Sequence, residues 1–130
     1  MGKGYILDTN TIIYYLEGIL NSSGKSFVEK AIVEGARISV ISKIELLAWN
    51  PPEGSNINNI KTFVQNSIIY SLSEAVADQT ILLRKNYRKI KLPDAIIAAT
   101  ALCFNLDLIS RNISDFSFIN GLTMIDPFKV

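Results

Sequence analysis

Short apolar runs alternate along the chain with longer segments in which apolar residues have the spacing of a helix. No other feature of the sequence restricts the possible folds as much as this alternation. The runs that read as strands are residues 5–7, 38–41, 68–72, 108–110 and 123–125. Between them, apolar residues recur three and four positions apart, as at Ile12, Ile13 and Leu16. Strands that alternate with helices predict an α/β sandwich around a central, mainly parallel sheet.

Capping and breaking residues place the helices. We expect helices at about residues 26–34, 42–49, 57–64, 74–87 and 93–105, with an earlier one ending near Gly18. Pro93 suits the first turn of the last helix. Ser42-x-x-Glu45 has the form of a capping box, in which Glu45 would reach back to a backbone amide. Because no linker or repeat interrupts the chain, residues 1–130 are expected to form one domain.

Composition excludes several classes of function. The chain has no histidine, which excludes Ser-His-Asp and Cys-His catalysis and every histidine-liganded metal site. A formal net charge of +1 gives no general attraction to nucleic acid, so any such affinity needs a local patch. Charged or polar residues interrupt every apolar stretch before the length of a membrane span, and the N-terminus lacks a signal peptide. A soluble cytoplasmic protein without a membrane partner is expected.

Four acidic residues follow predicted strands or begin a helix: Asp8, Glu45, Asp94 and Asp115. The carboxyl ends of parallel strands share one edge of a sheet, and ligands bind in the crevice there. Carboxylates gathered at that edge repel one another unless a cation lies between them, and Mg²⁺ and Mn²⁺ prefer such oxygen ligands. The pattern predicts a divalent metal site that serves phosphate chemistry.

Each of these acids also has a purely structural interpretation. Glu45 would belong to the capping box, Asp94 would favour a helix dipole, and Asp8 and Asp115 would cap turns. Against this, Asp8 directly follows a strand expected to be buried, where an unpaired charge is costly. One metal site accounts for all four positions, whereas the structural interpretation needs four separate reasons.

A basic segment immediately precedes Asp94. It contains five cations and no acid: Arg84, Lys85, Arg88, Lys89 and Lys91. Beside an acidic pocket, such a cluster can bind the backbone of RNA in a salt-dependent way. The alternative, a solvated helix face, remains open from the sequence.

Four segments together resemble the PIN-domain nucleases, and most closely the VapC-like toxins of toxin–antitoxin modules. They are Tyr5-Ile6-Leu7-Asp8-Thr9-Asn10, Ile41-Ser42-Lys43-Ile44-Glu45-Leu46-Leu47, Leu92-Pro93-Asp94-Ala95-Ile96-Ile97-Ala98-Ala99-Thr100-Ala101 and Leu108-Ile109-Ser110-Arg111-Asn112-Ile113-Ser114-Asp115-Phe116. No single segment is specific, but their order and spacing are. The resemblance covers essentially the whole chain.

This resemblance implies a three-layer α/β/α sandwich and a Mg²⁺- or Mn²⁺-dependent endoribonuclease. Asp8, Glu45 and Asp94 match the three principal acids of the family, and Asn10 matches a polar residue beside the first. Two residues compete for the fourth place, because many relatives carry an acid where this chain has Asn112. Either Asp115 completes the site or Asn112 contributes a neutral carbonyl ligand.

The same resemblance extends to partners and supporting residues. Ser110 and Thr9 are candidates for polar support of the site, by hydrogen bonding to the scissile phosphate or by capping a helix or turn. A VapC-like toxin implies an RNA substrate, a cognate antitoxin and a homodimer.

Two other functions compete with this one. Asp8-Thr9-Asn10-Thr11 is close to the Asp-x-Asp-x-Thr loop of HAD-type phosphatases, but Asn10 replaces the acid that would transfer protons. A catalytically degenerate PIN fold that binds RNA or protein is the second. Retention of Asp8, Glu45 and Asp94 argues against a degenerate site.

Overall fold

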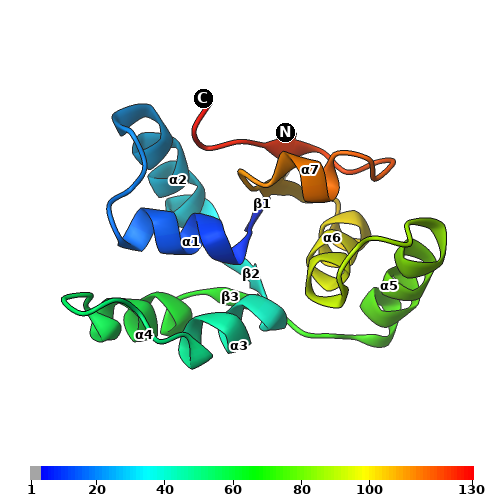
Figure 1. Cartoon of the computed structure of the whole chain (residues 1–130), viewed down its shortest axis with the longest axis horizontal. Coiled ribbons are helices and arrows are strands. Elements are labelled where there is room, and N and C mark those ends of the chain that lie inside the picture. Colours follow the sequence, from blue (N-terminus) through cyan, green and yellow to red (C-terminus); the bar gives the residue numbers. More distant parts are fainter. Residues whose placement is uncertain (1–3) are drawn as a thin grey trace.

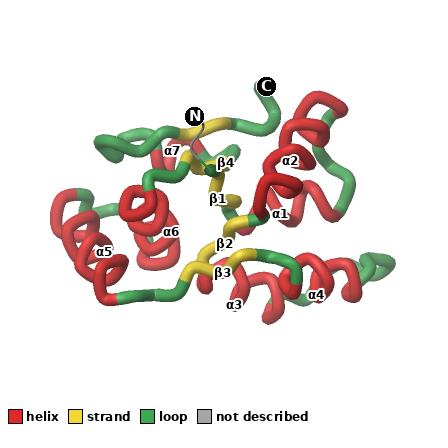
Figure 2. The backbone as a smooth tube through the Cα atoms, turned by 180° about the vertical axis from the view of Figure 1, so that it is seen from behind, coloured by secondary structure: helices red, strands yellow, loops and turns green. Residues whose placement is uncertain are grey.

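The computed structural model describes residues 4–130, in which five strands form one sheet. The strands are β1 (Tyr5–Leu7), β2 (Arg37–Ser39), β3 (Ile68–Tyr70), β4 (Asp107–Ile109) and β5 (Met124–Ile125). Their order is β3-β2-β1-β4-β5, and every neighbouring pair is parallel. The strands cross the middle of the molecule in Figure 2. The predicted parallel sheet is confirmed, and its carboxyl ends share one edge.

Helices cover both faces of this sheet. They are α1 (Thr9–Leu16), α2 (Ser22–Gly35), α3 (Val40–Ala48), α4 (Ile57–Gln65), α5 (Glu74–Asn86), α6 (Leu92–Phe104) and α7 (Ile113–Phe116). Figure 1 shows α5 and α6 side by side on one flank, with α1 and α2 on the other. None of the helices in residues 4–130 is both long and apolar enough to cross a membrane.

Alternation along the central strands divides the core into two. Ile6 and Leu108 face the core shared with α5 and α6, whereas Leu7 and Ile109 face the core shared with α1 to α4. Successive residues of a strand point to opposite faces, so each central strand must be apolar throughout. All four side chains are at most 1% exposed. The expected three-layer α/β/α sandwich is therefore confirmed.

Helix α6 is buried along most of its length. Residues 95–101 are all buried because the helix packs between the sheet and α5. Alanine at positions 95, 98, 99 and 101 keeps the helix surface narrow enough for contact on both sides. Asp94 lies in the first turn of this helix and is held in place by the burial of the residues that follow.

The boundary between β2 and α3 differs from the sequence-based expectation. The strand ends at Ser39 and the helix begins at Val40, two residues before the predicted Ser42. Ser39 is the N-cap, and its Oγ accepts a hydrogen bond from the Ile41 amide at 3.0 Å. Ser42 lies inside the helix and is buried, so the predicted capping box is wrong. Helix α2 also begins earlier than predicted, at Ser22, after the N-cap Asn21.

Candidate active site

Asp8 lies at the carboxyl end of the central strand β1, in the gap between β4 and α1. Its amide donates to the Ile109 carbonyl at 3.1 Å, which extends the parallel ladder by one residue. Its side chain is 6% exposed and does not cap α1. Instead, Ser110 Oγ donates to Asp8 Oδ2 at 2.8 Å. The carboxylate is thus buried at the sheet edge, and the turn-capping interpretation of Asp8 is wrong.

Burial raises the pKa of Asp8 from its ordinary 3.8 to about 6. The hydrogen bond from Ser110 acts in the opposite direction and lowers the pKa. The negative charges of Asp94 and Glu45 raise it further. Asp8 therefore lies within electrostatic reach of two other carboxylates.

Asp94 links the remaining acids. Asp94 is half-buried, and this burial is the largest cause that raises its pKa. The negative charges of Asp115 and then of Glu45 raise the pKa further. The Lys91 ammonium, one turn earlier, lowers it. The four predicted acids therefore form one electrostatically coupled group, which we call the acidic cluster: Asp8, Glu45, Asp94 and Asp115.

Glu45 of α3 is fixed by a hydrogen bond from helix α1 and not by a backbone amide at the N-terminus of α3. Thr9 Oγ1, at the start of α1, donates to Glu45 Oε1 at 2.6 Å. The same Oγ1 lies 2.8 Å from Ser42 Oγ, and both hydroxyls are buried. Glu45 itself is exposed to solvent. The sequence indicated Thr9 only as a cap or a donor to the scissile phosphate, and its contacts with Glu45 and Ser42 were missed because those residues lie 36 and 33 positions away.

Asp115 is in α7, where Asn112 orients it. Asn112 Nδ2 donates a short hydrogen bond to Asp115 Oδ2, and the Asn112 amide donates to Ser110 Oγ at 3.0 Å. Because Ser110 Oγ also donates to Asp8, hydrogen bonds through Asn112 and Ser110 connect Asp115 with Asp8. Of the two candidates for the fourth position, the structure places the Asp115 charge beside Asp94 and turns the Asn112 amide nitrogen toward Asp115. Asn10 is exposed and lines a pocket together with Asp8.

The basic segment divides into two parts. Arg84 and Lys85 lie in the last turn of α5, where cations favour the helix dipole. Lys89 and Lys91 line a pocket together with Asp94 and Asp115. Arg88 is exposed and does not line this pocket. Only the last two cations of the segment therefore adjoin the acidic cluster.

The acidic cluster suits a hard divalent cation by its chemistry. All four side chains offer carboxylate oxygens, the donors that Mg²⁺ and Mn²⁺ prefer. Burial and repulsion between the carboxylates raise the pKa of Asp8, and a cation between the carboxylates would lower it. Within residues 4–130, no three acidic or cysteine side chains stand close enough together to hold an ion as placed. The donor set fits the metal, and side-chain rotation would have to bring the donors together.

Replacing Ser110 with alanine should raise the pKa of Asp8 above about 6, because the hydrogen bond that favours the charged carboxylate is lost. Hydrogen bonds to charged groups contribute about 1.5–3 kcal/mol. The free energy of unfolding should therefore fall more at pH 8, where Asp8 is ionised, than at pH 4. Carboxyl-carbon NMR and urea melts at both pH values measure these effects. An unchanged pKa for Asp8 would show that Ser110 does not stabilise its charge.

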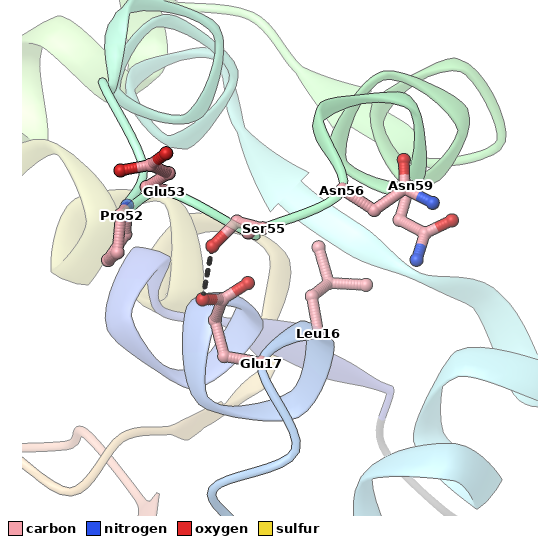
Figure 3. Close-up of a pocket in the computed structure, with 8 residues that line it drawn as sticks. Leu16, Glu17, Pro52, Glu53, Ser55, Asn56 and Asn59 are labelled. Atoms are coloured by element: carbon pink, nitrogen blue, oxygen red, sulfur yellow. Dashed lines mark hydrogen bonds between the residues drawn. The ribbon is translucent and has the colours of Figure 1, made fainter.

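A separate open pocket of about 400 Å³ lies between the end of α1 and the loop before α4 (Figure 3). It is lined by two carboxylates, Glu17 and Glu53, and Ser55 Oγ donates to Glu17 Oε1 at 2.7 Å. The pocket includes no member of the acidic cluster, no cation and no aromatic ring. We therefore assign no chemistry to it.

Comparison with known proteins identifies the family. The sequence model described as "PIN domain" matches residues 5–119, which include all four acids of the cluster. The chain belongs to the PIN domain family. Comparison with the curated proteins gives no match.

Solved structures with the same fold include a chain of a toxin–antitoxin complex. A toxin–antitoxin complex from Klebsiella pneumoniae has a chain 27% identical over 98% of this chain and 100% of its own, with a TM-score of 0.74. FitAcB from Neisseria gonorrhoeae matches at 24% identity, over 97% and 99% of the two chains, with a TM-score of 0.78. VapBC2 from Rickettsia felis, bound to a DNA fragment from its promoter, matches at 22% identity, over 93% and 96%, with a TM-score of 0.77.

Proposed function

We propose that this protein is a Mg²⁺- or Mn²⁺-dependent endoribonuclease that acts as the toxin of a toxin–antitoxin pair. The observation that carries the proposal is the acidic cluster at the carboxyl edge of the parallel sheet. Its four acids come from the end of β1 and from α3, α6 and α7, and they are coupled electrostatically. Membership of the PIN domain family supports the same conclusion.

Each acid has a role that follows from its surroundings. Asp8, Asp94 and Asp115 would hold the ion, because Asp8 is buried and the other two face one another across α6 and α7. Glu45 is exposed but fixed by Thr9, which suits it to orient a water molecule. When bound, Mg²⁺ or Mn²⁺ lowers the pKa of a bound water and offsets charge on the phosphate.

The proposed partners rest on the solved structures that this chain resembles. One of those structures is described as a toxin–antitoxin complex, and the other two are described as VapBC2 and FitAcB. We propose that this chain also binds a cognate antitoxin and that two copies associate. Co-expression with a small DNA-binding protein encoded upstream, followed by light scattering of the purified complex, tests both statements.

Cleavage of RNA by the purified protein tests the central proposal. A mixed panel of single-stranded and structured RNAs is incubated with Mg²⁺, with Mn²⁺ or with EDTA. We expect cleavage only with metal, and a loss of at least about 100-fold in Asp94→Asn, more than partners outside the ligand shell usually contribute. Asp78→Asn, an exposed acid on α5, is the matched control and should cut like wild type.

Two outcomes would favour the competing functions. Metal-independent RNA binding without cleavage, identical in wild type and Asp94→Asn, would indicate a degenerate PIN fold that binds RNA. Cleavage that persists in EDTA or in Asp94→Asn would exclude the acidic cluster as the reacting site. The PIN domain match leaves the HAD-type phosphatase alternative without support.

A further inference from the structure

Two pockets adjoin the acidic cluster, and each contains at least one cation and an aromatic ring. The first, of about 290 Å³, is the lysine pocket; it is lined by Lys89, Ile90, Lys91, Asp94, Ser114, Asp115 and Phe118. The second, of about 280 Å³, is the arginine pocket; it is lined by Asp8, Asn10, Tyr14, Arg111 and Asn112. Both are near the lower end of small-ligand pockets, roughly 300 Å³.

The two pockets share a wall within the acidic cluster. Asn112 lines the arginine pocket and donates its side-chain hydrogen bond to Asp115, which lines the lysine pocket. Asp8 belongs to one pocket and Asp94 to the other, and their charges interact. A phosphate placed at the acidic cluster would therefore adjoin both pockets.

Arg111 is held in the arginine pocket by aromatic rings. Its guanidinium carbon lies 4.3 Å from the centre of the Phe128 ring and 6.0 Å from that of Tyr14. These two rings meet edge to face at 5.4 Å. In residues 4–130, the Arg111 guanidinium forms no ion pair and donates no hydrogen bond, so its donors remain available. A stacked, charged guanidinium is well suited to bind phosphate.

The lysine pocket presents a ring beside two ammonium groups. Phe118 is 41% exposed and packs on one side against Tyr87, with ring centres 5.0 Å apart. The Tyr87 hydroxyl accepts a hydrogen bond from the Asn120 amide at 3.2 Å, which fixes this support. Lys89 and Lys91 are exposed. Exposed rings next to cations bind single-stranded nucleic acid by stacking a base and holding its phosphate.

We propose that one RNA strand crosses the acidic cluster from the lysine pocket to the arginine pocket, with one nucleotide of the cleaved step in each. The inference rests on the proposed function and names how its substrate is held. Phe118 stacks one base while Lys89 and Lys91 hold its phosphate. Arg111 and Tyr14 hold the neighbouring nucleotide. These three cations also offset the repulsion between four carboxylates and an anionic strand.

Binding is measured apart from cleavage, so that the two proposals can fail separately. The probe is a pool of fluorescein-labelled RNA hexanucleotides of random sequence, followed by anisotropy with Ca²⁺ in place of Mg²⁺. We expect Phe118→Ala to raise the Kd about fivefold or more, the range for loss of one stacked base. The double variant Lys89→Gln/Lys91→Gln should raise the Kd and reduce the slope of log Kd against log salt by about 1.4.

Arg111 has two informative variants. Arg111→Gln should raise the Kd about tenfold or more, as expected for a lost charge-assisted contact. Arg111→Lys keeps the charge and should recover part of this loss, which a purely structural role of the Phe128 contact would not produce. Combining Arg111→Gln with Phe118→Ala should multiply the two effects, because the residues hold different nucleotides.

Lys30→Gln, an exposed cation of α2 that lines neither pocket, is the matched control and should bind like wild type. If the pocket variants have the same Kd as Lys30→Gln while metal-dependent cleavage persists, the two-pocket assignment is wrong and the proposed function still stands. Wild-type protein that neither binds the RNA pool nor cuts RNA would overturn the proposed function as well. Circular-dichroism melts of every variant identify any that fail to fold.

Discussion

Replacing Asp8 with asparagine should abolish metal-dependent cleavage and, at neutral pH, raise the free energy of unfolding of the metal-free protein. Burial raises the folded-state pKa of Asp8 from 3.8 to about 6, so ionisation costs more free energy in the folded than in the unfolded chain. The cost is absent below about pH 4, grows as the pH rises from about 4 to about 6, and is complete above that. The full cost is about 3 kcal/mol, because each unit by which the pKa is raised corresponds to about 1.4 kcal/mol.

Urea melts of wild type and Asp8→Asn in EDTA, at pH 4.5 and pH 7.5, measure this effect. The variant should be the more stable protein at pH 7.5, and the difference should shrink at pH 4.5. Asp78→Asn on α5 removes an exposed carboxylate and should change stability by less than about 0.5 kcal/mol at either pH. A variant less stable than wild type at pH 7.5 would mean that the folded protein stabilises the Asp8 charge.

Metal should reverse the order of stability. An ion that binds only the folded protein adds about 4.1 kcal/mol at one thousand times its Kd, which exceeds the cost of about 3 kcal/mol for the Asp8 charge. Wild-type protein should gain this stabilisation from Mg²⁺ or Mn²⁺, and Asp8→Asn should not. Equal stabilisation of both proteins by metal would place the ion away from Asp8.

Replacing Thr9 with valine should reduce cleavage by about 10- to 100-fold, the range measured for partners that orient metal ligands. Valine has nearly the same shape but donates no hydrogen bond, so Glu45 loses its 2.6 Å contact and is free to rotate. Ser42 Oγ also loses its buried partner, which should lower the free energy of unfolding by about 1–3 kcal/mol. Cleavage kinetics and urea melts measure the two effects together.

Thr11→Val provides the matched control for this variant. Thr11 lies in the same helix, is fully buried, and donates from Oγ1 to the Ile109 carbonyl at 2.9 Å. Its side-chain hydrogen bond goes to a backbone carbonyl and not to an acid of the cluster, so its loss should lower stability by a similar amount and leave cleavage unchanged. Equal losses of cleavage in Thr9→Val and Thr11→Val would assign the effect of Thr9 to stability alone.

The sequence determined the fold class through the residues of the central strands. Ile6 and Leu7 in β1, and Leu108 and Ile109 in β4, are apolar on both faces, as only a sheet covered on both sides requires. It also located the four acids, because a carboxylate after a buried strand has few structural uses. Asp8, Asp94 and Asp115 could therefore be singled out before their mutual positions were known.

Element boundaries were less certain because several hydroxyl residues lie near each one. Ser39 and Ser42 are both acceptable N-caps by local preference, and the local pattern favoured Ser42 with Glu45. The pairing of β2 with β1 and β3 fixes where the strand ends, and that pairing depends on residues distant in sequence. Packing then turns Glu45 toward Thr9 of α1.

The neighbours of each acid were decided by tertiary structure alone. Ser110 reaches Asp8 across 102 positions of the chain, and Thr9 reaches Glu45 across 36. The same is true of Arg111 on the Phe128 ring and of the two pockets beside the acidic cluster. The amino-acid sequence fixes which groups can ionise, donate or pack, because these are properties of single side chains. Distances, burial and pKa values depend on which side chains the fold brings together, so only the tertiary structure sets them.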